Sequence, residues 1–238
     1  MSNFWEEVMP GGYYDEVLLS GIKAGRGIQP NWHNITFLEV GKYVEEDLIH
    51  LDYACGPGTF IGNYLFNNSL GVDISNEQIK YANKNYGNKA RFLNLEEYEN
   101  SEIIPESVDV ITVLGLFEFI NNQEIKTLVN KFFEILKPGG KIVITTLNYG
   151  SNMKYLIKLV NMFGTVGYGQ EHTNKLHEDT LQKLLLETRF NKIEIKQFIN
   201  FGVFFSFISI SFGIRMNEFI RKYIFRKKGY LLIGVIEK

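Results

Sequence analysis

The sequence predicts an α/β fold: a doubly wound, mostly parallel seven-stranded sheet with helices on both faces and an antiparallel strand near the C-terminus. Three observations support this prediction. Short apolar runs alternate with stretches of helical period over residues 48–146. Two glycines follow the first apolar run, as a strand-to-helix turn requires. Near the C-terminus, two strand-like patterns flank an insert in place of a simple crossover helix.

The composition is that of a globular protein with one large domain. The chain has 238 residues, of which 45% are hydrophobic and 22% charged, and its net charge of −2 gives no general attraction to nucleic acid. The single cysteine, Cys55, excludes an internal disulfide and a cysteine-based zinc site, and we expect no metal. The first residues lack the features of a secretory signal, so we expect a cytoplasmic protein. From the net charge we expect no nucleic acid partner.

The elements are expected in the following order. Residues 1–44 form an N-terminal helical cap, in which residues 35–44 have helical spacing, and residues 45–238 form the main domain. The expected strands are 48–54, 70–73, 90–93, 108–114 and 141–146, and the helices between them are 59–66, 75–86 and 123–136. A turn at 137–140 precedes the fifth strand. A helix at 178–187 and strands at 192–198 and 229–236 follow, with substrate-side insertions at about 147–177 and 199–228.

The glycine pair after the first strand marks a ligand site. In open α/β sheets, ligands bind beyond the carboxyl ends of the strands, where Gly56 and Gly58 are expected. A dinucleotide fingerprint, G-x-G-x-x-G, would place a third glycine at position 61, but this chain has Ile61. The departure disfavours a nicotinamide-dependent oxidoreductase.

The stretch Leu51-Asp-Tyr-Ala-Cys-Gly-Pro-Gly58 resembles the first motif of the class I S-adenosylmethionine-dependent methyltransferases, with Ala54 in place of its first glycine. Three further stretches resemble that family in the same order: Gly71-Val-Asp-Ile-Ser75, residues 107–120 and Leu136-Lys-Pro-Gly-Gly-Lys141. The resemblance implies S-adenosylmethionine as methyl donor and S-adenosylhomocysteine as product. It also implies that the loop Asp52, Ala54, Gly56 and Gly58 holds the methionine part, with Asp52 near the ammonium group.

The remaining cofactor contacts come from the same resemblance. Asp73, at the end of the second strand, matches the acid that accepts hydrogen bonds from the ribose hydroxyls. Asn94 and Glu96 both match the region that meets the adenine amino group, and this choice stays open. The resemblance further implies contacts from Ile74, Leu114, Phe117 and Tyr14.

Histidines are the candidates for a catalytic base. Many relatives carry a histidine where this chain has Phe119, so the base must lie elsewhere. His33 in the N-terminal cap and His172 after the fifth strand are the two candidates; the alternatives are a solvated His33 and a His172 that only caps a helix. We expect His50 at the far end of the first strand and His177 at a helix end.

The apolar stretch 198–214 is too short and too interrupted for a membrane span, and basic residues follow it. It predicts a pocket lid, a homodimer surface or contact with an anionic membrane. We expect methyl transfer to an O or N atom of a small-molecule acceptor. Two alternatives stay open: a methyltransferase of a membrane lipid or quinone, and an inactive cofactor-binding partner subunit. The fourth strand is not followed by the motif of DNA amino methyltransferases.

Overall fold

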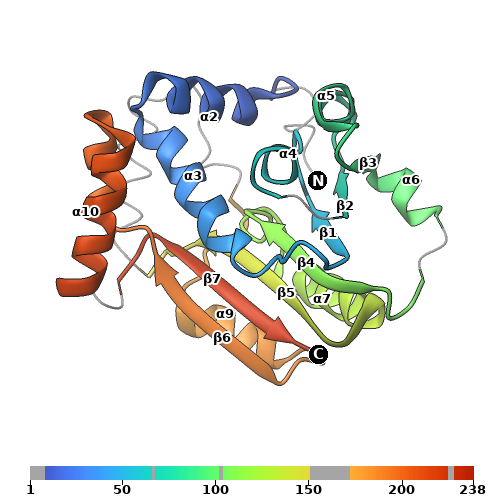
Figure 1. Ribbon diagram of the computed structural model, residues 1–238. Helices are drawn as coiled ribbons and strands as arrows, with labels where there is room; N and C mark the ends of the chain where they lie inside the picture. Colours follow the sequence, from blue (N-terminus) through green and yellow to red (C-terminus); the bar gives the residue numbers. More distant parts are fainter. Residues whose placement is uncertain (1–8, 66–67, 102–103, 151–171, 225–227) are drawn as a thin grey trace.

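The computed structural model describes residues 9–65, 68–101, 104–150, 172–224 and 228–238. Within them the predicted mixed sheet is confirmed: seven strands lie in the order β3-β2-β1-β4-β5-β7-β6 (Figure 1). Strands β1 to β5 pair in parallel, and β7 is antiparallel to both β5 and β6. The strand order reverses between β1 and β4, which is the topological switch point where such sheets bind ligands.

The strands are β1 (His50–Tyr53), β2 (Ser69–Asp73), β3 (Arg91–Asn94), β4 (Val108–Leu114), β5 (Leu136–Leu147), β6 (Lys192–Phe198) and β7 (Leu231–Glu237). The helices of the first part are α2 (Tyr13–Ala24), α3 (Ile28–Gly41), α4 (Thr59–Tyr64), α5 (Asn76–Tyr86) and α6 (Leu95–Glu99). Those of the second part are α7 (Asn122–Ile135), α9 (Glu178–Leu186), the 3-10 helix η2 (Phe201–Phe207) and α10 (Ile210–Tyr223).

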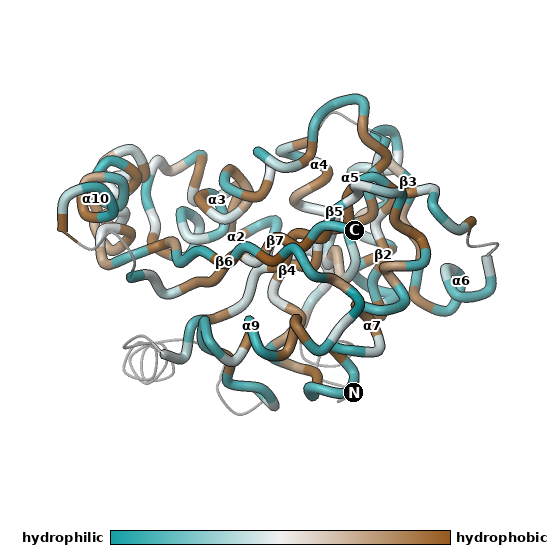
Figure 2. The backbone as a smooth tube through the Cα atoms, turned by 90° about the horizontal axis from the view of Figure 1, so that it is seen from below, coloured by the Kyte–Doolittle hydropathy of each residue, from teal (hydrophilic) through white to brown (hydrophobic). Residues whose placement is uncertain are grey.

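Two apolar layers hold the helices against the sheet. Because successive strand residues point to opposite faces, Val143 packs with α3, α4 and α5, whereas its neighbours Ile142 and Ile144 pack with α7 and α9. Figure 1 shows α3 and α4 on one side of the sheet and α7 and α9 on the other. The central strands β4 and β7 are buried over most of their length and read as continuous apolar runs, brown at the centre of Figure 2.

The N-terminal helices predicted for residues 1–44 are present as α2 and α3, and α2 is fastened at both ends. At its start, buried Asp15 accepts hydrogen bonds from the hydroxyls of Tyr81 (2.9 Å) and Tyr86 (2.7 Å) on α5. Beyond its other end, Gly27 N donates to Ser206 O of η2 (2.8 Å). The cap therefore spans from α5 to the C-terminal insert.

Helix α3 begins at Ile28, earlier than the predicted 35–44. Its first turns carry buried polar residues in place of apolar ones: Asn31 Nδ2 donates to Ser206 Oγ (2.7 Å), and Asn34 Oδ1 accepts from the Tyr64 hydroxyl (2.9 Å). Apolar spacing therefore does not mark this part of the helix.

Strand β5 is longer than predicted, because Leu136 already pairs with Val108 directly after α7. The register then shifts by the next pair, Val110 with Lys141, so the expected turn at 137–140 is an irregularity within the strand. Gly139 has the positive φ of 78° that this bend uses.

The predicted insertion 199–228 contains η2 and α10, which pack against each other and against α3. Asn200 and Asn217 join them, since Asn200 N donates to Asn217 Oδ1 and Asn200 Nδ2 donates to Asn217 O, both at 2.8 Å. None of the helices that the structure describes is long and apolar enough to cross a membrane. The insertion predicted at 147–177 falls mostly on residues 151–171, outside the described residues.

Candidate active site

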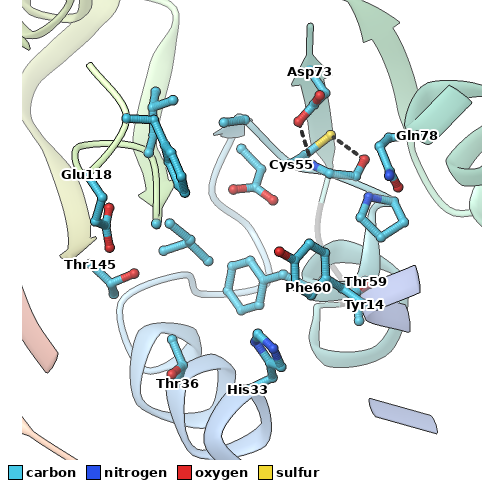
Figure 3. Close-up of a pocket in the computed structure, with 18 of the residues that line it drawn as sticks. Tyr14, His33, Thr36, Cys55, Thr59, Phe60, Asp73, Gln78, Glu118 and Thr145 are labelled. Atoms are coloured by element: carbon cyan, nitrogen blue, oxygen red, sulfur yellow. Dashed lines mark hydrogen bonds between the residues drawn. The ribbon is translucent and has the colours of Figure 1, made fainter. Parts of the chain in front are cut away.

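A cavity of about 570 Å³ lies at the carboxyl ends of β1, β2, β4 and β5, under the cap formed by α2 and α3. This volume is in the range of small-molecule sites in proteins. Figure 3 shows Asp73 and Gln78 on one side of it and Glu118 and Thr145 on the other, with His33 and Thr36 of α3 below them. We call the side with Asp73 the cofactor end and the side with Glu118 the acceptor end.

The loop after β1 has three residues in the left-handed region: Ala54 (φ 63°), Gly56 (φ 54°) and Gly58 (φ 75°). A side chain on Gly58 would meet the Phe92 ring at 2.7 Å, so this glycine is needed for packing of the loop against the fold. A Cβ on Gly56 would meet nothing within 4 Å, and Gly56 lines the cavity. Gly56 therefore leaves backbone open for a ligand.

Asp73 closes this loop at the end of β2. Its Oδ2 accepts a hydrogen bond from Gly56 N (2.8 Å), and its Oδ1 accepts one from Ser75 N (2.9 Å). Burial raises the pKa of Asp73, and these backbone N–H groups counter the rise. Each carboxylate oxygen can accept a further hydrogen bond, so the pair suits a ligand with two neighbouring hydroxyls.

Asp52 lies at the bottom of the cavity, where burial raises its pKa to about 7 against the lowering effect of the Thr112 hydroxyl. Thr112 Oγ1 donates to Asp52 Oδ1 (2.6 Å) and also pairs with His50 Nε2 (2.8 Å). Because Thr112 has one hydroxyl proton, His50 Nε2 must be the donor in that second bond. The Ser69 hydroxyl pairs with His50 Nδ1 at 2.9 Å.

His50 was predicted at the far end of the strand, and it does begin β1 without lining the cavity. Burial lowers its pKa to about 3, so its imidazole is neutral. Its link to Asp52 was not visible in the sequence, because Thr112, which bridges these two residues of β1, comes from β4. The alternation of His50 and Asp52 on one strand face is the signal that could have suggested it.

The cap contributes an aromatic wall to the cavity. Tyr14 meets His33 edge to face (5.5 Å between ring centroids), His33 stacks on Phe37 (6.1 Å), and Phe37 stacks on Phe60 (5.4 Å). All four line the cavity. Burial lowers the pKa of His33 to about 4, which makes this imidazole a weak base.

Glu118 is the main feature of the acceptor end, and the sequence interpretation did not select it. It lies after β4, is only 4% exposed and lines the cavity. Its Oε1 accepts a hydrogen bond from Leu147 N (2.9 Å), but its Oε2 has no partner among the described residues. Burial raises the pKa of Glu118 to about 7, although backbone hydrogen bonds and the nearby Thr146 hydroxyl counter the rise.

His172, the other predicted base, stands behind the wall at the acceptor end. Its ring meets Phe119 at 5.1 Å, and its Nδ1 pairs with the Tyr149 hydroxyl. Burial and the nearby charge of Glu118 raise the pKa of Tyr149 to about 12, so its hydroxyl stays protonated. Phe119 and Thr173 line the cavity, whereas His172 does not.

The structure brings together most of the predicted cofactor residues. Those that line the cavity are Tyr14, Asp52, Ala54, Gly56, Asp73, Ile74 and Leu114. Gly58 lies in the same loop, with its face toward Phe92.

Three predicted residues lie elsewhere. Phe117 is fully buried in the core. Asn94 and Glu96 line a neighbouring hollow of about 340 Å³, which shares Ile74 with the cavity. Asn94 caps α6 there, because its Oδ1 accepts from Glu97 N (2.8 Å) and its Nδ2 donates to Asn76 Oδ1 (3.0 Å). Across the parts of the chain that the structure describes, no group of three or more His, Cys, Asp or Glu side chains could hold a metal ion.

The geometry agrees with what comparison with known proteins finds. Residues 51–144 match the family described as methyltransferase domain. Over 113 residues the chain is 24% identical to an uncharacterized methyltransferase of Schizosaccharomyces pombe, a match that covers 43% of this chain and 39% of that protein's length.

Solved structures of methyltransferases share the fold. An S-adenosylmethionine-dependent methyltransferase of Archaeoglobus fulgidus superposes with a TM-score of 0.59 at 20% identity, covering 86% of this chain and 92% of that one. A possible histamine N-methyltransferase of Thermotoga maritima has a TM-score of 0.59 at 14% identity, covering 86% and 88%. Phosphoethanolamine N-methyltransferase 2 of Haemonchus contortus has a TM-score of 0.56 at 17% identity, covering 87% and 52%.

Proposed function

Because the chain belongs, through residues 51–144, to the class I S-adenosylmethionine-dependent methyltransferase family, we propose that it transfers a methyl group from this cofactor to an O or N atom of a small-molecule acceptor. The observation that carries the proposal is the cofactor end of the cavity. There Asp73, at the end of β2, accepts a hydrogen bond from Gly56 N. The space beside the Gly56 backbone is open, because a Cβ built on Gly56 would meet no atom within 4 Å. A nucleoside with a ribose diol fits both features.

The described residues divide the work of holding the cofactor. Asp73 accepts the ribose hydroxyls, the loop at Gly56 and the nearby Asp52 receive the methionine part, and Ile74 and Leu114 supply apolar contacts to the base. The cofactor supplies an electrophilic methyl group on a sulfonium. Much of the rate enhancement then comes from orientation and exclusion of water, which the covering cap residues Tyr14, His33 and Phe37 provide.

Two measurements test this proposal. Isothermal titration with S-adenosylhomocysteine and with NAD should give binding only for the first, and the reverse result would favour an oxidoreductase. Incubation of the protein with methyl-labelled cofactor and a cell extract should transfer label to an acceptor. Cofactor binding without any labelled product would favour the inactive partner subunit.

A second candidate function, methylation of a membrane lipid or quinone, is favoured by the surface of η2 and α10. Seven large apolar side chains there are at least 40% exposed: Phe201, Phe207, Ile208, Phe212, Phe219, Tyr223 and Ile224. We call this set the aromatic patch. Exposed Arg215, Arg221 and Lys222 lie on the same helix. Apolar side chains beside basic ones are typical of helices that lie on anionic membranes.

The aromatic patch is linked to the cavity by ring contacts. Phe201 contacts Phe204 (5.2 Å between centroids), Phe204 contacts Tyr230 (6.2 Å), and Tyr230 stacks on Trp32 (6.2 Å), which lines the cavity. Figure 1 shows α10 at the edge of the molecule, beside the cap. The aromatic patch therefore lies close to the cavity in which an apolar acceptor would bind.

Flotation with vesicles separates the two candidates. A lipid acceptor predicts binding to anionic vesicles that salt weakens, and reduced binding when Phe207 and Phe219 are replaced with serine. Absence from anionic vesicles at low salt would leave the small-molecule acceptor as the proposal. Because both positions are exposed, the variants should fold normally.

A further inference from the structure

Glu118 is a nearly buried acid that lines the cavity. One oxygen is held by Leu147 N, which fixes the direction of the carboxyl group, while Oε2 has no partner among the described residues. A nearly buried carboxylate is costly without a counter-charge, so a cationic group of a ligand in the cavity would stabilise Glu118. In Figure 3 the Glu118 carboxyl lies on the acceptor side, away from Asp73.

Among the residues that the structure describes, the walls of the cavity provide no lysine or arginine for this carboxylate. The described lining residues include Asp52, Asp73, Glu118 and Glu124, but no lysine or arginine. The Oε2 atom of Glu124 accepts a hydrogen bond from Asn121 N (2.8 Å) at the start of α7, so its role is to cap that helix. A site with this charge pattern disfavours an anionic acceptor and favours a cationic one.

The surroundings of Glu118 also suit a cation on a partly apolar body. Phe119, Trp32 and Leu147 line the same cavity, and aromatic faces attract ammonium groups. From this combination we propose that Glu118 binds a basic amine of the acceptor, which makes the protein an N-methyltransferase for amines. This inference rests on the proposed function and specifies its substrate class.

Proton transfer also favours an amine over a hydroxyl. An alkylammonium group has a pKa of about 10.4, roughly three to four units above the pKa of about 7 at Glu118. An aliphatic hydroxyl resembles water, with a pKa of about 15.7, so its deprotonation by Glu118 is far more unfavourable. His33, with its pKa lowered to about 4, is a weaker base than Glu118 for either group.

The reaction balances with Glu118 as the proton acceptor. The ammonium group of the acceptor gives one proton to the Glu118 carboxylate and becomes a neutral amine. The nitrogen lone pair then forms the new N–C bond, while the electron pair of the broken C–S bond remains on sulfur. The products are the methylated ammonium ion and S-adenosylhomocysteine, and the proton on Glu118 passes to solvent before the next turnover.

The test uses methyl-labelled cofactor and a small-molecule extract of the source cells, separated by ion exchange into cationic, neutral and anionic fractions. The wild-type protein should label a compound in the cationic fraction. Glu118→Gln, which keeps the size and the acceptor for Leu147 N, should lower that labelling at least tenfold. Its affinity for S-adenosylhomocysteine, measured by calorimetry, should stay within about twofold of the wild-type value, because Glu118 lies at the acceptor end.

Glu187→Gln is the control, since exposed Glu187 pairs with Lys126 and does not line the cavity, and labelling should be unchanged. Labelling of a neutral or anionic compound, or full activity of Glu118→Gln, would overturn the amine inference and leave methyl transfer intact. Absence of label from every fraction would contradict the proposed function as well. The fraction that the wild-type protein labels is measured without any variant. The inference is therefore tested even if Glu118→Gln is unstable.

Discussion

The two ends of the cavity differ in how completely the protein's own hydrogen bonds hold their carboxylates. Asp73 accepts two backbone N–H groups and Asp52 accepts the Thr112 hydroxyl. Glu118 has Leu147 N on one oxygen and no described partner on the other. The protein therefore holds both oxygens of Asp73 at the cofactor end but only one oxygen of Glu118 at the acceptor end.

The largest expected effect is a dependence of stability on pH, to which both ends of the cavity contribute. Burial raises the pKa of both Asp52 and Glu118 to about 7, from 3.8 and 4.5. In the cofactor-free protein each carboxyl therefore binds its proton more tightly when folded, so stability is fully present below the unfolded pKa and is lost as pH rises toward 7. The loss is at most about 3 kcal/mol for Glu118. Denaturant unfolding at pH 5 to 8 should show the decline.

Glu118→Gln should reduce this decline by up to the same amount, because its side chain does not titrate. An identical slope in Glu118→Gln and the wild-type protein would mean that Glu118 does not carry the raised pKa, and the contrast between the two ends would lose its electrostatic basis.

The next effect concerns cofactor affinity. Asp73→Ala should weaken binding of S-adenosylhomocysteine by about 2–3 kcal/mol, roughly 30- to 150-fold, since hydrogen bonds to a charged group are lost. Calorimetry measures this directly, with Glu118→Gln as the comparison at the other end. Equal losses in the two variants would show that the ends are not separate sites.

The two glycines of the loop after β1 give a smaller contrast. Gly58→Ala should lower the free energy of unfolding by about 2 kcal/mol, because φ is 75° and the new Cβ meets Phe92. Gly56→Ala should lower the free energy of unfolding by about 1 kcal/mol, because of its φ of 54° alone. Relative to this loss of stability, Gly56→Ala should weaken cofactor binding more than Gly58→Ala does. Thermal unfolding and calorimetry on both variants check this.

The smallest effect is expected at Ala54. This residue has a φ of 63°, which strains any side chain, and it stands where the family motif has glycine. Ala54→Gly should raise stability by about 0.5 kcal/mol, since relief of the strain exceeds the entropic cost of glycine. A loss of stability would mean that the Ala54 methyl group contributes packing that outweighs its strain.

The sequence predicted the sheet better than the acceptor end, for physical reasons. Strands such as β4 (Val108–Leu114) are buried on both faces and end at glycines or acids, so the local sequence determines where they begin and end. The start of α3 is stabilised instead by Asn31 bonding to Ser206, far along the chain. Likewise Glu118 is visible as an acid after β4, but the direction of its carboxyl group depends on Leu147 N, from another strand.

The attachment of the cap at both ends determines how the cavity can exchange its contents. A hinge motion of α2 would have to break the bonds from Tyr81 and Tyr86 to Asp15, or those of Gly27 and Gly25 to the insert (2.8 Å each). Each such hydrogen bond contributes about 1 kcal/mol. Rotation of the lining side chains breaks none of these four contacts. We therefore expect ligands to enter and leave the cavity through side-chain rotation, which is far faster than hinge closure.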